Sequence, residues 1–177
     1  PTTNSTGIGG SETAVIEIAK RFNRDGWLVD VYNEPDHLEG DYNGVGYWGL
    51  SRYKPSEADV FVSWRNPTLL RTTNFKPGKL RILWCHDLNR GPDEYGLHKD
   101  WDLVLGVSQW HANYLKNIYG LDNVSYVPNG IDMDRFRNRP EKIAFRCVYA
   151  SSQDRGLLNL LRMWPEITSV EPTAELH

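Results

Sequence analysis

The chain has 177 residues, of which 40% are apolar, and its formal net charge is −3. A chain of this length can bury a substantial core, and this charge excludes both a strongly basic nucleic-acid binder and a disordered acidic tail. We therefore expect a globular protein with no nucleic-acid partner. No stretch approaches the roughly 20 apolar residues that span a bilayer, and no leader resembles a signal peptide. These features predict a cytoplasmic protein, with peripheral attachment to a membrane as an alternative.

The first 55 residues predict a helix, a strand and a long loop. Ser11 is a good helix N-cap, apolar residues recur after it at helical spacing, and Asp25-Gly26 ends the pattern, which predicts a helix over 11–25. A β-rich run follows at 27–32. Residues 35–55 mix glycines with aromatic residues, and this composition predicts a long, irregular surface loop of the kind that often carries function.

The pattern from residue 59 onward alternates strands with helices. Apolar runs predict strands at 60–64, 80–85, 103–107 and 124–127. Between them we expect a short helix near 67–73 and a helix from Ser108, its N-cap, to about Gly120. Near-continuous apolar strands that alternate with helices indicate a parallel sheet covered on both faces. The predicted fold class is therefore α/β, with a Rossmann-like sheet over residues 1–131.

A second, partial unit is predicted after residue 131. Residues 132–145 are rich in charged residues, which predicts a solvated linker. A strand at 147–150 and a helix at 157–163 then form one βα unit within 146–177, which we interpret as the start of a second, truncated Rossmann-like domain. Only six residues precede Gly7, so the strand that normally leads into a glycine-rich loop is also expected to be missing.

The two cysteines, Cys85 and Cys147, both lie in apolar runs. Two cysteines are too few for the disulfide framework of a small secreted domain. We expect both thiols to be reduced and buried.

The glycine-rich segment from Gly7 to Glu12 is the first candidate binding element. Gly9 and Gly10 stand directly before a predicted helix, where free backbone amides and the helix dipole favour a phosphate. The alternative is a tight loop that needs glycine only for its backbone conformation. The spacing is not that of a dinucleotide-binding loop, and no Lys-Ser/Thr pair of a P-loop follows.

His86 is the candidate catalytic residue, because it follows the strongest predicted strand, and ligands of open α/β sheets bind at the carboxyl ends of strands. The alternative is a histidine that ties down the next loop. We expect no metal, since Cys85, His86 and Asp87 alternate in direction along a strand and have no second ligand pair. Asp132 and Asp134 resemble an Asp-x-Asp metal motif, but their charged surroundings favour a linker or a helix cap.

Read together, these motifs resemble the GT-B glycosyltransferases of family 4. The shared series is Gly-Gly-Ser-Glu at a helix start, His86-Asp87 after a strand, the string from Pro128 to Asp132, and Arg155-Gly156 before Leu-Leu. The Pro-Asn-Gly-Ile-Asp string is the most specific element. In this family it marks the crossing from an acceptor-binding domain to a donor-binding domain, and the resemblance extends from the glycine loop to about Leu161.

The resemblance implies roles for single residues. Gly9 and Gly10 would approach the donor diphosphate, and His86 would contact the donor sugar near the reacting carbon. Arg155 stands where the family usually has a lysine that neutralises the leaving phosphate. Ser151 and Ser152 occupy the region of the family's second basic residue, so phosphate neutralisation is expected to be weaker or arranged differently.

The function implied by the resemblance is transfer of a sugar from a nucleotide-sugar donor, with retention of configuration and without a metal or other cofactor. The acceptor, a carbohydrate, lipid or protein, would contact Tyr47, Trp48 and Asp87. The family's Glu-x7-Glu element and most of the donor domain do not occur in the chain, so we expect the chain by itself to be inactive. The alternatives are a non-catalytic carbohydrate- or partner-binding module that uses the aromatic segment 41–53, and a nicotinamide-dependent enzyme.

Overall fold

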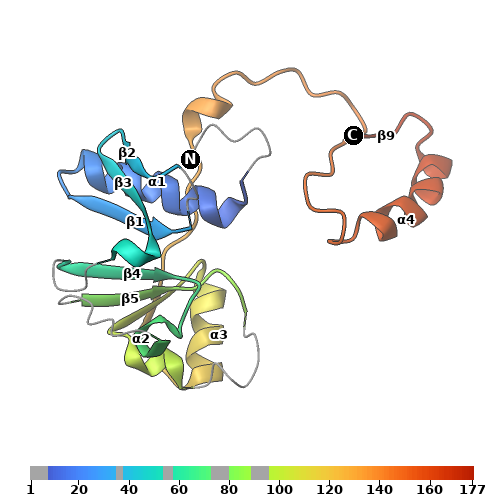
Figure 1. Ribbon diagram of the computed structural model, residues 1–177. Helices are drawn as coiled ribbons and strands as arrows, with labels where there is room; N and C mark the ends of the chain where they lie inside the picture. The colour runs from blue at the N-terminus through green and yellow to red at the C-terminus, as the bar shows by residue number, and fades with distance from the viewer. Residues whose placement is uncertain (1–7, 35–37, 54–57, 73–79, 89–95) are drawn as a thin grey trace. The chain divides into compact units, whose positions relative to one another are not determined.

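The computed structural model describes residues 8–34, 38–53, 58–72, 80–88 and 96–177 (Figure 1). The chain divides into two compact units, residues 1–130 and residues 131–177. The division falls directly after Gly130, within the Pro-Asn-Gly-Ile-Asp string.

The first helix, α1 (Gly10–Arg24), matches the predicted helix but begins one residue earlier. Its N-cap is Gly9 and not Ser11, so the predicted cap was wrong. The Ser11 side chain lies inside the first turn, where its hydroxyl donates to the carboxylate of Glu12 at 3.0 Å. Asp25 and Gly26 end the helix as predicted, with Gly26 at a φ of 93°.

A three-stranded sheet has the order β1-β3-β2, and two of its strands, β2 and β3, lie within 35–55, where a long loop was predicted. It consists of β1 (Val29–Asn33), β2 (Gly40–Tyr42) and β3 (Val45–Gly49), and a 3₁₀ helix at Leu50–Arg52 follows. The loop prediction was wrong because Asn43 and Gly44, at φ 58° and 81°, form a two-residue turn that pairs β2 antiparallel to β3. Asn-Gly is the strongest short hairpin signal.

This sheet packs against α1 through a small core. Ala19 of α1 and Val45 and Tyr47 of β3 are buried, and half-buried Ile16, Val29 and Val31 surround them. Because β3 has a neighbour on each side and lies against α1, it is the most enclosed strand of this sheet.

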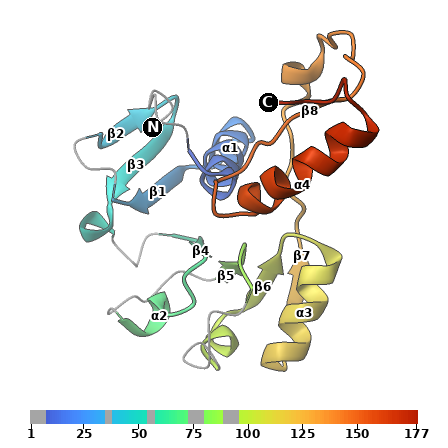
Figure 2. The ribbon, with the colours of Figure 1, turned by 90° about the vertical axis from the view of Figure 1, so that its right-hand side faces the viewer.

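The second sheet of the first unit has four strands, all parallel, in the order β4-β5-β6-β7. They are β4 (Val60–Trp64), β5 (Leu80–Trp84), β6 (Leu103–Gly106) and β7 (Val124–Tyr126). The connections carry α2 (Leu69–Thr72), a 3₁₀ helix at Leu97–Asp100 and α3 (Gln109–Tyr119) (Figures 1 and 2). The sheet and its flanking helices confirm the predicted α/β fold of the Rossmann-like kind.

The core of this sheet centres on Trp101, which is 2% exposed and stacks on Phe61 with 6.0 Å between ring centroids. The other buried members come from the strands, from α3 and from the loop after α3: Leu83, Cys85, Val104, Leu115, Tyr119 and Leu121. Ser108 caps α3 by accepting the amide of His111, and Gly120 ends α3 at a φ of 60°, both as predicted.

Close contact between β6 and α3 depends on Gly106, the last residue of β6. A Cβ atom at this position would lie 2.9 Å from the backbone nitrogen of Ala112 and 3.2 Å from Cβ of His111. The missing side chain therefore lets the first turn of α3 approach the carboxyl end of the sheet.

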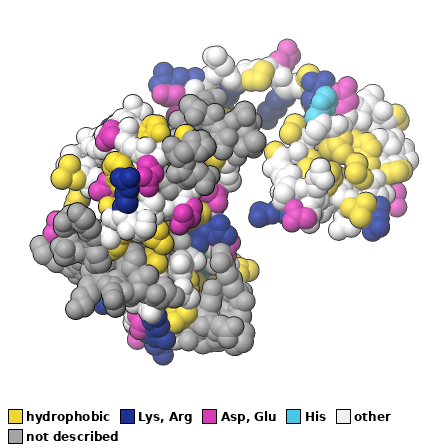
Figure 3. All heavy atoms as spheres, in the orientation of Figure 1, with side chains coloured by type: hydrophobic (Ala, Val, Ile, Leu, Met, Phe, Trp, Pro, Cys, Tyr) yellow, Lys and Arg dark blue, Asp and Glu magenta, His cyan; other side chains and the backbone are white. Residues whose placement is uncertain are grey.

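The second unit contains β8 (Arg146–Cys147), α4 (Leu157–Val170) and β9 (Glu175–Leu176), and β8 and β9 pair in parallel. The helix is longer than the predicted 157–163, because it continues through Pro165 to Val170. Apolar side chains gather on the face of this unit that Figure 3 shows, and Leu158, Met163 and Val170 are among the exposed ones.

Both thiols are free, but only Cys85 is buried, so the expectation of burial was wrong for Cys147. The reason is that β8 has only two residues and both are exposed. Over the described residues, every helix is too short or too polar to cross a bilayer.

Candidate functional site

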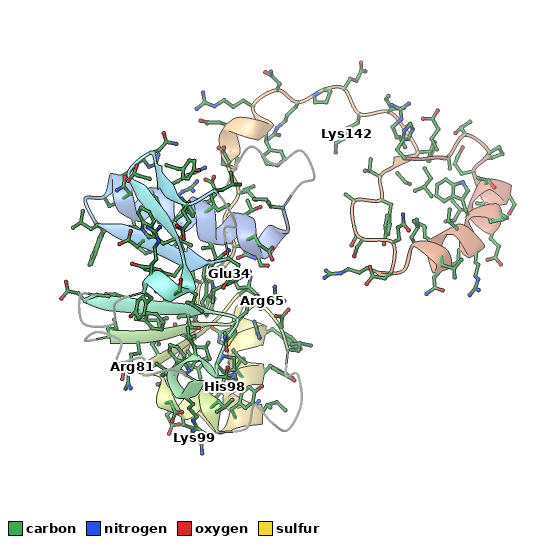
Figure 4. The ribbon with its side chains drawn as sticks, in the orientation of Figure 1. Glu34, Arg65, Arg81, His98, Lys99 and Lys142 are labelled. Carbon is green, nitrogen blue, oxygen red and sulfur yellow. The ribbon has the colours of Figure 1, made fainter. Side chains whose placement is uncertain are left out.

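Charged and polar side chains gather where β4 and β5 end. Arg65 directly follows β4, and His86 and Asp87 follow β5 after Cys85. Arg65 donates from Nε to the Asp87 carboxylate at 2.5 Å, and its guanidinium lies over the ring of Trp64 at 5.2 Å. Figure 4 labels Arg65 at this end of the sheet. Because both strands run in parallel, their carboxyl ends bring these three side chains to one edge, where open α/β sheets bind ligands.

A small pocket opens at this edge. Arg65, His86 and Asp87 line it together with residues that follow β4 and β5, one from the 3₁₀ helix before β6 and two from α3: Pro67, Cys85, Leu88, His98, Leu115 and Tyr119. His98 is buried and stacks on Tyr119 with 3.7 Å between ring centroids, so two of the lining residues form an aromatic pair. The pocket therefore combines a guanidinium, a carboxylate, imidazoles and a phenol ring in its lining.

The first turn of α1 meets the same edge through Glu12. One Glu12 carboxylate oxygen lies 3.8 Å from Nη1 of Arg65. The side chain also folds back over Gly9, where an added Cβ atom would stand 2.2 Å from Oε2 of Glu12. The predicted phosphate position before α1 thus holds the chain's own carboxylate, which is the charge that a helix N-terminus attracts. An incoming phosphate would have to displace Glu12. Gly7 lies outside the described residues.

His86 is half-buried between two indole rings. Its ring meets Trp84 edge-on with 4.5 Å between centroids and Trp64 with 6.4 Å. The Nε2 atom is buried and has no hydrogen-bond partner among the described residues. A buried polar nitrogen without a partner is costly and calls for an explanation, for which a ligand or water is the usual one. His86 therefore has a buried ring nitrogen that is left for a water or a ligand to satisfy.

Burial lowers the pKa of His86 below its ordinary value of 6.5, and the Arg65 guanidinium and the His111 ring lower it as well. The carboxylates of Asp87 and Glu12 act in the opposite direction but do not reverse the shift. His86 is thus neutral at pH 7 and can either donate or accept one hydrogen bond at each ring nitrogen.

The structure brings together only part of the predicted site. His86 and Asp87 lie in one pocket, and Gly9 and Gly10 are connected to it through Glu12 and Arg65. Tyr47 is buried in the core beside α1, so its ring is a packing residue there. Trp48 is half-buried in β3, where its Nε1 donates to the Asp30 carboxylate at 2.7 Å.

Arg155 lies in the second unit, in the exposed turn before α4. Asp132 is the N-cap of a 3₁₀ helix at Met133–Phe136 and accepts the amide of Asp134, which supports a capping role for this pair. Within the described ranges, no three residues among His, Cys, Asp and Glu come together in a way that could hold a metal ion.

Arg65 and His111 are site residues that sequence reasoning missed. Arg65 had a detectable signal, because it follows a predicted strand just as His86 does. His111 had none, since it falls on the third position of α3, where a histidine reads as ordinary helix surface, yet it is 3% exposed and contacts the loop of Asp87. Its placement depends on how α3 packs on β6.

No family model matches the chain, and no curated protein matches it.

We predict that the free energy of unfolding decreases as the pH falls below 6.5. Burial lowers the pKa values of His86 and His111 in the folded chain. Below 6.5 the unfolded chain therefore binds more protons than the folded chain, by up to about 1.4 kcal/mol per pH unit for each histidine. Urea titrations at pH 7.5, 6.5 and 5.5 measure this effect. A free energy of unfolding that stays constant or increases over this range would refute it.

Proposed function

We propose that the chain is the acceptor-side part of a retaining, metal-independent GT-B glycosyltransferase of family 4, and that its first unit supplies one part of the nucleotide-sugar site, the part that contacts the diphosphate and the sugar at the edge formed by α1, β4 and β5. The observation that carries the proposal is the meeting of the α1 first turn with His86 and Arg65 at the carboxyl ends of two parallel strands. That edge is where the motif resemblance requires the diphosphate and the sugar.

Each residue of the proposed site has a role in donor binding that follows from its chemistry. The amides at Gly9 and Gly10 and the dipole of α1 attract the diphosphate. Arg65 adds a guanidinium at the same edge. His86 presents its buried Nε2 atom to a sugar hydroxyl. In the complete enzyme the amides and cations stabilise the departing nucleoside diphosphate while the acceptor hydroxyl attacks from the same face.

Glu12 is expected to oppose donor binding. Its carboxylate occupies the N-terminal turn and faces Arg65, so it competes with a diphosphate for both groups. Donor binding requires Glu12 to rotate away, and its half-exposed side chain leaves room for that.

The substitution Gly10→Ala tests the proposal because it separates folding from binding. An added Cβ atom at Gly10 meets no atom within 4 Å, so the variant keeps the fold and gains about 0.5 kcal/mol from the lower entropy of its unfolded chain. The same methyl group stands where a diphosphate must approach the backbone. We expect the affinity for UDP-glucose or GDP-mannose, measured by calorimetry, to fall at least about tenfold.

The matched control is Gly130→Ala, where an added Cβ atom again meets nothing within 4 Å. It should leave donor affinity unchanged. Equal losses in the two variants, or no binding of any nucleotide sugar, would sink the proposal. Binding of a glycan that Gly10→Ala does not affect and Trp48→Ala abolishes would favour the carbohydrate-binding module instead.

A further inference from the structure

The His111 ring connects two segments of the first unit that are far apart in sequence. Its Nδ1 atom accepts the amide of Val107 at 3.2 Å, just beyond the end of β6. Its Nε2 atom lies 3.0 Å from the carbonyl oxygen of Asp87, in the loop after β5. The ring is thus a bridge between the start of α3 and the loop that carries His86 and Asp87.

These contacts fix the protonation state of the ring. A carbonyl oxygen can only accept, so Nε2 must carry the proton, and an amide can only donate, so Nδ1 must be bare. The ring therefore fits its site only as the neutral Nε2–H form. A second proton on Nδ1 would face the Val107 amide and break that hydrogen bond.

Gly106 and Ser108 hold the His111 ring closely in place. Gly106 lets α3 approach β6, as an added Cβ atom there would lie 3.2 Å from Cβ of His111. Ser108 then fixes the first turn by accepting the backbone amide of His111 at 3.1 Å. With 3% of its surface exposed, the ring has little room for another rotamer.

We propose that His111 is a positioning residue of the donor site: its neutral ring holds the loop after β5 so that His86 and Asp87 face the pocket and Asp87 can orient Arg65. The proposal rests on the function proposed above. His111 itself does not need to touch the donor, because it acts through the backbone of Asp87 and through the Asp87–Arg65 ion pair.

The charged and titratable surroundings favour the neutral form. From the ends of β5 and β4, the groups that face the ring are His86, Asp87 and, through Asp87, Arg65. Tyr114 contacts the ring from α3 itself, with 6.4 Å between centroids. Burial lowers the pKa of His111, and the Asp87 carbonyl and carboxylate only partly oppose this. The lowered pKa keeps the ring neutral as the pH passes 6.5, and only stronger acidification, which protonates His111, loosens the loop of His86 and Asp87 and lowers donor affinity.

Two substitutions separate positioning from general packing. In His111→Gln the side-chain amide nitrogen takes about the place of Nε2 and can still donate to Asp87. In His111→Asn the amide oxygen takes about the place of Nδ1 and keeps only the Val107 contact. Both variants lose the ring, so a merely structural residue would show similar losses in both. We expect UDP-glucose or GDP-mannose affinity to stay within about threefold for Gln and to fall about tenfold or more for Asn.

A second measurement does not depend on donor binding. Long-range proton–nitrogen NMR spectra resolve the ring nitrogens of the five histidines. We expect His111 to carry its proton on Nε2 at pH 7, and the His86 ring signals to stay in place in His111→Gln and to move in His111→Asn. A proton on Nδ1 of His111, or equal displacement of His86 in both variants, would overturn the proposal. If no nucleotide sugar binds the unsubstituted chain, the proposed function fails, and the NMR result alone decides the role of His111.

Discussion

Replacing Trp101 with alanine will lower the free energy of unfolding by about 3–5 kcal/mol. The indole is 2% exposed, stacks on Phe61 and donates from Nε1 to the carbonyl of Pro67 at 3.3 Å. Its removal leaves a cavity against the four-stranded sheet and an unsatisfied carbonyl. Because domains of this size are stable by only about 5–15 kcal/mol, the change removes a large share of the total.

Urea unfolding followed by circular dichroism measures this loss, and Trp110→Ala is the matched control. Trp110 is 63% exposed and stacks on Tyr114 along α3, so its removal should cost less than about 1 kcal/mol. Similar losses for the two tryptophans would show that Trp101 is not the centre of the core.

Replacing His86 with alanine will weaken nucleotide-sugar binding by about 10- to 100-fold, since a sugar hydroxyl loses its partner in a partly buried site. The same change should leave the affinity for the nucleoside diphosphate without its sugar nearly unaltered. This split follows from the proposed position of His86, whose buried Nε2 atom has no partner among the described residues and which the proposal places at the sugar and not at the phosphates.

Calorimetry with UDP-glucose and with UDP, or with GDP-mannose and GDP, measures the split. His177→Ala, which removes an exposed imidazole in the second unit, is the control and should change neither affinity. Equal weakening for the sugar-bearing and sugar-free ligands would contradict the role given to His86.

The strands of the four-stranded sheet could be predicted because their burial leaves a strong trace in the sequence. The run Leu80–Trp84 is almost wholly apolar, and the structure has a strand there within a parallel sheet. Ser108 and Gly120 likewise mark the ends of α3 by local chemistry, as a capping hydroxyl and a left-handed glycine. Local signals of this kind do not depend on tertiary packing.

The predictions were wrong where tertiary packing, or a second signal in the same segment, decides the local structure. Glycines and aromatic residues suggested a loop over 35–55, although Asn43-Gly44 marked a hairpin whose strand β3 is buried by α1. Cys147 sits in an apolar run, but its short strand leaves it exposed.

The residues of the candidate site also divide into those that local sequence signals predict and those that depend on tertiary packing. His86 and Asp87 could be found from their position after a strand, whereas the bridge from His111 to the Asp87 carbonyl depends on the approach of α3 to β6. The Glu12 side chain folds back over Gly9. No sequence pattern predicted this side-chain conformation.

The most direct test of the proposed donor site is backbone and side-chain NMR of the labelled chain during titration with UDP-glucose and with GDP-mannose. We predict that one of these donors shifts the signals of Gly9, Gly10 and Glu12 in the first turn of α1 together with those of Arg65 and His86, at a single dissociation constant. Shifts confined to β3 around Trp48, or to the second unit, with the signals of α1 and His86 unchanged, would contradict the account.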